Sequence, residues 1–395
     1  MNLSGSIRIL KDLPFVFRLS LMLLLLFLIV DVTLSEPRYF RPGHAMGQDH
    51  CAVLTSELNA LKSSRARLQN KLQNTAGSEK QSLIQQIKEL DAEIQEKQRQ
   101  LNRCVVHYEV RPSQTDPKIN NPNRLHEVYV RADGFGDLLF MFFPGSPQQP
   151  SEFKKLLETA ARAGYHVIGV DYPNQEGELR TICDDRPNCY GPLRREVLEG
   201  RDVSPEVAID TDNCILNRAV KLLQWLDVNH PNEKWGQFLN SGQIRWSHVT
   251  VAGHSQGGGY AAMIARLFEV HRVIMFSSVT DATNGSSGFL SAPWLTQPPL
   301  TPHDRYYGFG NTEDNLFFPQ IDVNWKTLAL SGVKTNVDTS PAPYNGSHRL
   351  TTSNDSQHSG TPIHRHNLVV TDKDTPLDSN EDPAYLAVWR YLIGP

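Results

Sequence analysis

The sequence has little net charge, because 39 Lys and Arg residues are balanced by 43 Asp and Glu residues, which gives −4 at pH 7. It therefore has no basic excess of the kind that binds nucleic acid, and it has no acidic tail. Its hydrophobic content of 39% and charged content of 21% resemble those of globular proteins and exclude a disordered chain. A length of 395 residues allows one large domain with accessory segments.

The sequence also lacks a long uncharged apolar run. The main run covers only residues 19–30, whereas a membrane-spanning helix needs about 18 or more apolar residues. Arg8 and Lys11 precede the run, and small and polar residues follow it at residues 33–35. We therefore predict that residues 1–35 are a signal peptide and that the protein is secreted. A type II signal anchor is the alternative, because residues 13–34 are mostly apolar, and only this form would hold the protein at a membrane.

Three Asn-x-Ser sequons beyond this segment fit a secretory route. They predict N-glycosylation at Asn284, Asn345 and Asn354. Such triplets also arise by chance, so they support the signal peptide without establishing it.

Residues 51–104 contain no proline, and apolar residues recur in them at heptad spacing along two successive stretches. The stretches are separated at Gly77, which predicts two amphipathic helices joined by a turn. If the two helices are antiparallel, the residue numbers of each facing pair, such as Leu54 with Leu101, add to the same total. The numbers of Cys51 and Cys104 add to that total as well, so these cysteines would face each other. We expect an antiparallel coiled-coil hairpin with a Cys51–Cys104 disulfide, after a linker over residues 36–50. The alternative is a parallel oligomeric coiled coil cross-linked between chains, and a protein partner or a second copy would bind at residues 51–104.

Residues 105–395 alternate short β-rich runs with helical stretches, which predicts an α/β fold. The expected strands are residues 105–110, 125–130, 138–143, 165–171, 247–252, 272–276, 304–309 and 366–371. The expected helices are residues 151–163, 211–229, 256–268 and 382–392. This alternation is typical of a mostly parallel, here eight-stranded, sheet with helices on both faces, and functional residues are expected at the carboxyl ends of its strands.

An apolar strand leads directly into Gly253-His254-Ser255-Gln256-Gly257, and a helix with small residues follows. A nucleophile elbow requires this context, since its serine has a strained backbone and its neighbours two positions away must be small. Ser255 is therefore the predicted nucleophile.

The chain resembles the α/β-hydrolase superfamily and, more narrowly, a family of secreted bacterial α/β-hydrolase-like proteins of unassigned substrate. The matching pieces within residues 105–395 are FFPGS (142–146), GYHVIGVDYPN (164–174), CYGPLRREVLEG (189–200), WSHVTVAGHSQGGG (246–259) and HNLVVTDKDTPLD (366–378). The resemblance implies an α/β-hydrolase fold with catalytic residues in the order Ser, acid, His.

Oxyanion donors are expected from the backbone N–H of Gln256 and from the loop after residues 138–143. In that loop Ser146 is the first candidate and Gly145 the second, because the neighbouring prolines have no N–H.

The base is expected among four late histidines, His348, His358, His364 and His366. His366 is preferred because it matches the histidine of the resembling family, and His364 is its rival. A His-x-His pair without acids or cysteines at ligand spacing does not predict a metal site, so we expect no metal and no cofactor.

The acid is less defined. Asp314 follows the predicted strand 304–309, where the superfamily usually has its acid, and Asp281 and Glu313 are the alternatives.

Residues 174–209 form a long insertion that we interpret as a lid. Within it, Cys183 and Cys189 are expected to form a local disulfide, and Cys214 is left as a buried thiol. Residues 331–361 are rich in Ser, Asn, Thr and Gly and are expected to form a polar loop.

Together these features predict a secreted serine hydrolase that cleaves carboxylic esters through an acyl-enzyme, with Ser255, His366 and Asp314 as a triad. The alternative is a non-catalytic binding or structural protein that retains the hydrolase scaffold and binds a partner through the hairpin.

Overall fold

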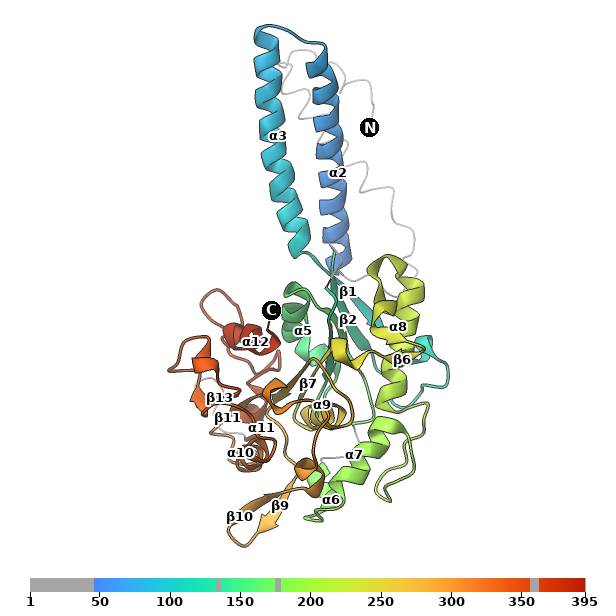
Figure 1. Ribbon diagram of the computed structural model, residues 1–395, viewed down its shortest axis with the longest axis vertical. Helices are drawn as coiled ribbons and strands as arrows, with labels where there is room; N and C mark the ends of the chain where they lie inside the picture. The colour runs from blue at the N-terminus through green and yellow to red at the C-terminus, as the bar shows by residue number, and fades with distance from the viewer. Residues whose placement is uncertain (1–45, 133–135, 175–178, 356–361, 395) are drawn as a thin grey trace, which may run out of the picture. The chain divides into compact units, whose positions relative to one another are not determined.

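The computed structural model describes residues 46–132, 136–174, 179–355 and 362–394. Helices α2 (Met46–Gln73) and α3 (Ser78–Arg103) form a hairpin (Figure 1). Helix α2 begins inside the segment expected to be a linker. The predicted signal segment 1–35 lies outside the described residues. In the part of the chain described, no helix combines the length and the apolar content needed to cross a membrane.

The hairpin is held by apolar contacts and by ion pairs between its helices. Lys97 Nζ of α3 lies 2.6 Å from Glu57 Oε2 of α2, and Arg65 pairs with Asp91 in the same way. These pairs explain how two charged residues fit into an otherwise apolar seam, because each is neutralised by the opposite helix. Cys51 and Cys104 lie at disulfide distance, with Cα atoms 5.8 Å apart. The leucines that this packing buries are Leu54, Leu58, Leu83 and Leu101.

The rest of the described chain is built on one sheet, whose strand order is β1-β2-β4-β3-β7-β8-β11-β13-β12. Its strands are β1 (Val105–Val110), β2 (His126–Arg131), β3 (Leu139–Phe143), β4 (His166–Gly169), β7 (Val249–His254), β8 (Arg272–Phe276), β11 (Tyr306–Asn311), β12 (Thr335–Asn336) and β13 (Arg349–Thr352). Strand β2 is antiparallel to β1 and β4, and all other neighbouring pairs are parallel. This confirms the predicted α/β fold with a mostly parallel sheet and an N-terminal helical pair.

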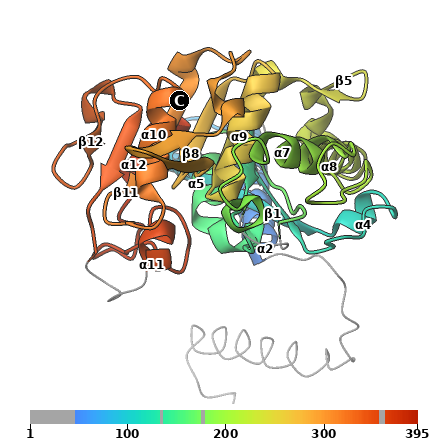
Figure 2. The same ribbon diagram turned by 90° about the horizontal axis from the view of Figure 1, so that it is seen from below.

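Both faces of the sheet are covered, as the all-apolar strand β3 requires. Its odd-numbered residues Leu139, Met141 and Phe143 share a core with α7 (Tyr190–Glu199), α8 (Ile215–Asn229), α9 (Gln256–Leu267) and α10 (Phe318–Thr327). Its even-numbered residues Phe140 and Phe142 share another core with α5 (Lys154–Arg162) and α12 (Leu386–Ile393). Figure 2 shows α7 beside α9, and α8 beside α7, on the first face. The shorter elements are α4 (Pro112–Thr115), α6 (Leu179–Cys183), α11 (Pro362–Asn367), β5 (Leu239–Asn240), β6 (Gln243–Ile244), β9 (Ala282–Gly285) and β10 (Gly288–Ser291).

The last strand was predicted wrongly. Residues expected to form a strand at 366–371 belong instead to α11 and to a buried segment after it, in which the Val369 carbonyl accepts a hydrogen bond of 2.9 Å from Trp389 Nε1. The end of the sheet is formed by β13 and β12, which lie within the expected polar loop 331–361, and within the described residues the sheet has nine strands rather than eight. Thr352 of β13 is fully buried because its hydroxyl donates to Asp338 at 2.8 Å, so a polar side chain occupies a core position.

The insertion at 174–209 contributes to the core. Cys183 and Cys189 lie at disulfide distance, with Cα atoms 5.5 Å apart, and connect α6 to the start of α7. Helix α7 buries Leu193, Val197 and Leu198 against the sheet's first face. Cys214 is a buried free thiol.

Candidate active site

Ser255 stands at a sharp turn between β7 and α9, and its backbone has φ 52° and ψ −120°. This conformation is strained for a residue with a side chain. The flanking glycines allow it, since a Cβ at Gly253 would lie 2.3 Å from the Gly257 carbonyl carbon and one at Gly257 would lie 2.0 Å from the Phe143 oxygen. The spacing of the motif is therefore explained by contacts between β3, β7 and α9.

The two expected oxyanion donors lie beside this turn. Gln256 is the first residue of α9, where a backbone N–H has no acceptor within the helix. The loop after β3 passes close to the serine, because a Cβ at Gly145 would lie 3.1 Å from Ser255 Cβ. Ser146 lines the same pocket as Ser255. Asn174 fixes this loop, as its Nδ2 donates to the Gly145 carbonyl at 2.7 Å and its own carbonyl accepts from Ser146 Oγ at 2.6 Å.

His366 and Asp314 are joined by a buried hydrogen bond of 2.7 Å between Nδ1 and Oδ2, and both side chains are 1% exposed. The other carboxylate oxygen of Asp314 accepts from the Phe317 N–H at 3.3 Å. Because a carboxylate only accepts, Nδ1 carries the proton and Nε2 of the neutral ring keeps its lone pair. Nε2 is buried and has no hydrogen-bond partner among the described residues. His366 and Ser255 line the same pocket.

The alternative acids are placed differently. Asp281 forms a fully buried ion pair with Arg194, with two N–O distances of 2.6 Å, and also accepts from Trp294 Nε1 at 2.8 Å. Glu313 is exposed at the surface. Neither carboxylate therefore has the position relative to His366 that Asp314 has.

The other histidines also have different surroundings. His364 Nδ1 lies 3.1 Å from Asp374 Oδ1. His348 Nδ1 lies 3.0 Å from the Tyr306 carbonyl, and its ring stacks on Tyr307. His358 lies outside the described residues.

His254 is a residue of this site that the sequence reasoning missed. Its Nε2 lies 3.2 Å from the His366 carbonyl oxygen, which also accepts from Ser277 Oγ at 2.7 Å, and its Nδ1 lies 2.7 Å from the Gln148 side chain. Burial lowers the pKa of His254 well below its ordinary value, and the neighbouring His366 lowers it further. His254 is thus neutral and supports the backbone of His366. The available signal was its position directly before Ser255.

The pocket at Ser255 is a narrow slot with a free volume of about 30 Å³. Phe317, Ile363 and Leu179 give it apolar walls. Arg180 adds a positive charge, as its guanidinium lies 5.7 Å from the Phe317 ring centre and donates to the Leu316 carbonyl at 3.2 Å. Pockets that bind small molecules usually have volumes of about 300 to 1,000 Å³, so the space next to the serine is small.

One cluster outside this slot has metal-ligating side chains. His107, Glu109 and Glu127 bring their ligand atoms within 4.8 Å of one another. The ammonium of Lys154 lies 3.2 Å from Glu109 and 3.6 Å from Glu127, and Tyr129 donates to Glu127 at 3.2 Å. Lys154 therefore provides one positive charge to these two carboxylates, and His107 Nε2 also contacts Glu127.

No family model and no curated protein matches this sequence. Among solved structures, the chain is similar to esterase B from Lactobacillus rhamnosis, in a structure described with a C4-C4 sn3 tributyrin phosphonate inhibitor. The identity is 14% and the TM-score is 0.38, over 80% of this chain and 97% of the other. The roles of the site residues therefore depend on the geometry given above.

Proposed function

We propose that the protein is a serine hydrolase that cleaves carboxylic esters through an acyl-enzyme. The observation that carries the proposal is the buried Asp314–His366 hydrogen bond, whose imidazole shares a slot with Ser255 at the strained turn. A serine hydroxyl becomes a nucleophile when a base removes its proton and an acid orients that base, and Ser255, His366 and Asp314 would have these three roles.

In the proposed reaction, His366 Nε2 removes the hydroxyl proton as Ser255 Oγ attacks the ester carbonyl carbon. The N–H groups of Gln256 and Ser146 stabilise the negative charge that develops on the carbonyl oxygen. His366 then donates the proton to the leaving alcohol, and the acyl group stays on Ser255. A water molecule, deprotonated by His366, attacks the acyl carbonyl carbon, and His366 returns the proton to Ser255 Oγ as the acid leaves. Asp314 keeps its negative charge throughout and stabilises the imidazolium. The small volume beside Ser255 supports testing esters with a short acyl chain first.

We further propose that the protein is secreted. The cysteine pairs Cys51–Cys104 and Cys183–Cys189 at disulfide distance support this proposal, since disulfides persist in oxidising compartments. The sequon residues Asn284 and Asn345 are exposed.

The narrowness of the slot also supports a second candidate, a non-catalytic protein on the same scaffold. In that case the hairpin over residues 51–104 would bind a partner, and Ser255 would not react.

The test is covalent labelling of the full secreted chain with a fluorophosphonate probe, followed by hydrolysis of short-chain nitrophenyl esters. Wild type is expected to be labelled and active, and Ser255→Ala is expected to lose both signals while it keeps its melting temperature. Ser63→Ala, which changes an exposed hairpin serine, is the matched control and should behave as wild type. No labelling of wild type would reject the hydrolase in favour of the binding protein, and labelling of Ser255→Ala would reject Ser255 as the nucleophile.

A further inference from the structure

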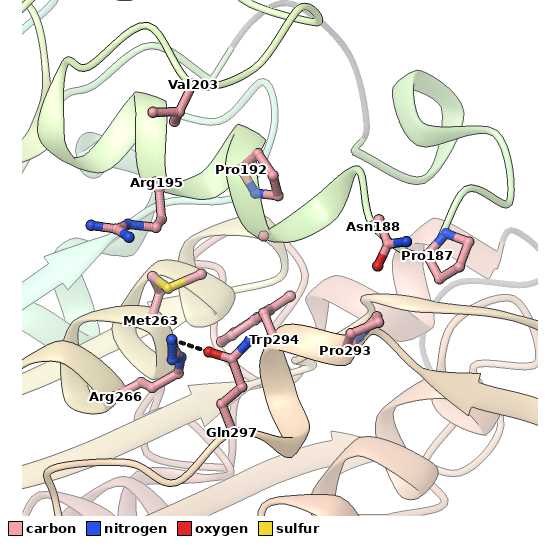
Figure 3. A pocket seen from close by; sticks show the side chains of 11 residues that line it. Pro187, Asn188, Pro192, Arg195, Val203, Met263, Arg266, Pro293, Trp294 and Gln297 are labelled. Carbon is pink, nitrogen blue, oxygen red and sulfur yellow. Dashed lines mark hydrogen bonds between the residues drawn. The ribbon is translucent and has the colours of Figure 1, made fainter.

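A second pocket lies between α7, α9 and the short helix η6 (Pro293–Thr296), and it has a volume of about 400 Å³ (Figure 3). This size falls within the range of about 300 to 1,000 Å³ that is usual for small-molecule sites. None of its lining residues lines the slot at Ser255. It is therefore separate from the proposed active site.

The pocket has an excess of positive charge. Arg195 and Arg266 both line it, and no Asp or Glu is among its described lining residues. Arg195 Nη2 lies 2.9 and 3.0 Å from the oxygens of Glu199, a carboxylate that also lies 3.5 Å from Arg201. Arg266 donates to the side-chain oxygen of Gln297 and has no ion pair within the described part of the chain. Arg195 therefore shares its carboxylate with a second guanidinium group, and Arg266 has no carboxylate partner among the described residues.

The two pocket arginines are close enough to repel each other. Burial lowers the pKa of Arg266, and the like charge of Arg195 lowers it further. Figure 3 shows both side chains toward one end of the pocket with Met263 between them, and Asn188 toward the other end. An anion at the arginine end would relieve this repulsion.

Both arginines also have unused hydrogen-bonding capacity. The Nε atoms of Arg195 and Arg266 are buried, and neither has a hydrogen-bond partner among the described residues. A guanidinium binds a phosphate or carboxylate through two parallel N–H groups, of which Nε–H is commonly one. A small reorientation of each side chain around an oxyanion would satisfy these donors.

The remaining wall is apolar. Trp294 is largely buried, and its indole N–H donates to Asp281 at 2.8 Å. Trp294 therefore offers the pocket an apolar ring surface. Met263, Pro192 and Val203 add further apolar surface. A ligand that fits this lining has a charged end and an apolar or aromatic body.

We propose that this pocket binds a small organic anion, whose phosphate or carboxylate group pairs with Arg195 and Arg266 and whose apolar body lies against Trp294. This site is additional to the proposed hydrolase site and does not depend on that function.

The test measures binding of four probes to the full chain by titration calorimetry or saturation-transfer NMR. Phenyl phosphate and benzoate carry both a ring and an anion, inorganic phosphate carries only the anion, and phenol carries only the ring. One or both of the first two are expected to bind more tightly than phosphate and phenol, and their relative affinities show which anion the pocket prefers. Arg266→Gln is expected to weaken that binding about tenfold or more, because a charge-assisted hydrogen bond is lost. Arg195→Gln should act in the same direction.

The matched control is Arg99→Gln, which removes one exposed, ion-paired guanidinium from the hairpin and should leave binding unchanged. Melting temperatures check that each variant is folded, and if Arg266→Gln is not, Arg195→Gln carries the test. The proposal is wrong if neither ring-bearing anion binds saturably at millimolar concentration, if phenol binds equally well, or if the folded arginine variants bind as wild type does. Equal binding of inorganic phosphate would overturn the role of the Trp294 wall.

Discussion

Asp314 Oδ2 and His366 Nδ1 lie 2.7 Å apart although 52 residues separate them in the chain. Asp314 belongs to the turn after β11, and His366 belongs to α11. His254 and Ser277 hold the backbone of His366 through its carbonyl oxygen, at 3.2 and 2.7 Å. The imidazole is thus fixed from its ring and from its backbone, which is the preorganisation that proton transfer to one defined nitrogen requires.

Replacing Asp314 by Asn is expected to reduce ester turnover by about 10⁴-fold, because an amide can hold the imidazole in the tautomer that has its proton on the wrong nitrogen. The melting temperature should change little, since the side chain keeps its shape. Steady-state rates on one short-chain ester measure the effect, with Glu313→Gln as the exposed neighbouring control. If both variants retain wild-type turnover, Asp314 is not the orienting acid.

Replacing Asp281 by Asn should instead affect stability. The change leaves the fully buried Arg194 guanidinium without its carboxylate, and breaking such a pair typically costs about 3 to 5 kcal/mol. Chemical denaturation measures this loss. Any folded fraction should still be labelled at Ser255 by a fluorophosphonate. A stable Asp281→Asn variant that has lost all labelling would indicate that Asp281, not Asp314, serves the histidine.

The sequence predicted the parts of this fold that have a local signal. Strand β3 reads as a continuous apolar run, and Ser255 is bracketed by glycines whose absent side chains the backbone contacts require. The other parts depend on distant partners. Strand β13 contains buried threonines whose hydroxyl groups have partners elsewhere in the chain, since Thr352 donates to Asp338 and Thr351 donates to the Thr335 carbonyl. The segment after His366 looks like a strand, but its buried valines pack near Trp389 of α12.

The candidate site follows the same division. Ser255 could be identified from its motif, whereas placement along the chain alone left Asp314, Asp281 and Glu313 open. The two aspartates differ because Arg194 forms an ion pair with Asp281. Arg194 lies in the insertion, and no local sequence pattern links it to either acid. The position of His254 next to Ser255 places it near the site, but its contact with the His366 carbonyl depends on a segment 112 residues away in the chain.

Asp372 is expected to give the stability a defined pH dependence. Its carboxylate accepts from the N–H groups of Lys154 and Lys155 at 2.9 and 3.0 Å, and burial raises its pKa from 3.8 to about 6. Between these two pKa values the folded chain binds more protons than the unfolded chain, so this group's contribution to stability falls as the pH rises from about 4 to about 6. Above that range the contribution stays constant.

Asp372→Asn removes this titration. The difference in the free energy of unfolding, variant minus wild type, should therefore be about 2 kcal/mol more favourable to the variant at neutral pH than at acidic pH. Urea unfolding of both proteins at about pH 4 and about pH 7 gives the difference, in which the other titrating groups cancel. Parallel pH profiles for the two proteins would show that Asp372 titrates at its ordinary pKa.

The Cys51–Cys104 pair is expected to stabilise the hairpin and to leave the proposed active site unaffected. Closing a loop with a sequence separation of 53 residues is worth about 4 kcal/mol in the chain-entropy model. The hairpin depends on this link because its seam includes Lys97 and Arg65, whose ion pairs replace apolar contacts and are partly exposed. The Cys51→Ser, Cys104→Ser double variant should lose helical circular dichroism at a lower temperature than wild type. Turnover of a small ester should stay within about twofold, since no slot residue lies in residues 51–104.

Non-reducing peptide mapping together with a mass measurement identifies the link directly. A Cys51–Cys104 peptide from a monomer supports the hairpin, and covalent dimers through either cysteine would replace it with a parallel oligomeric stalk.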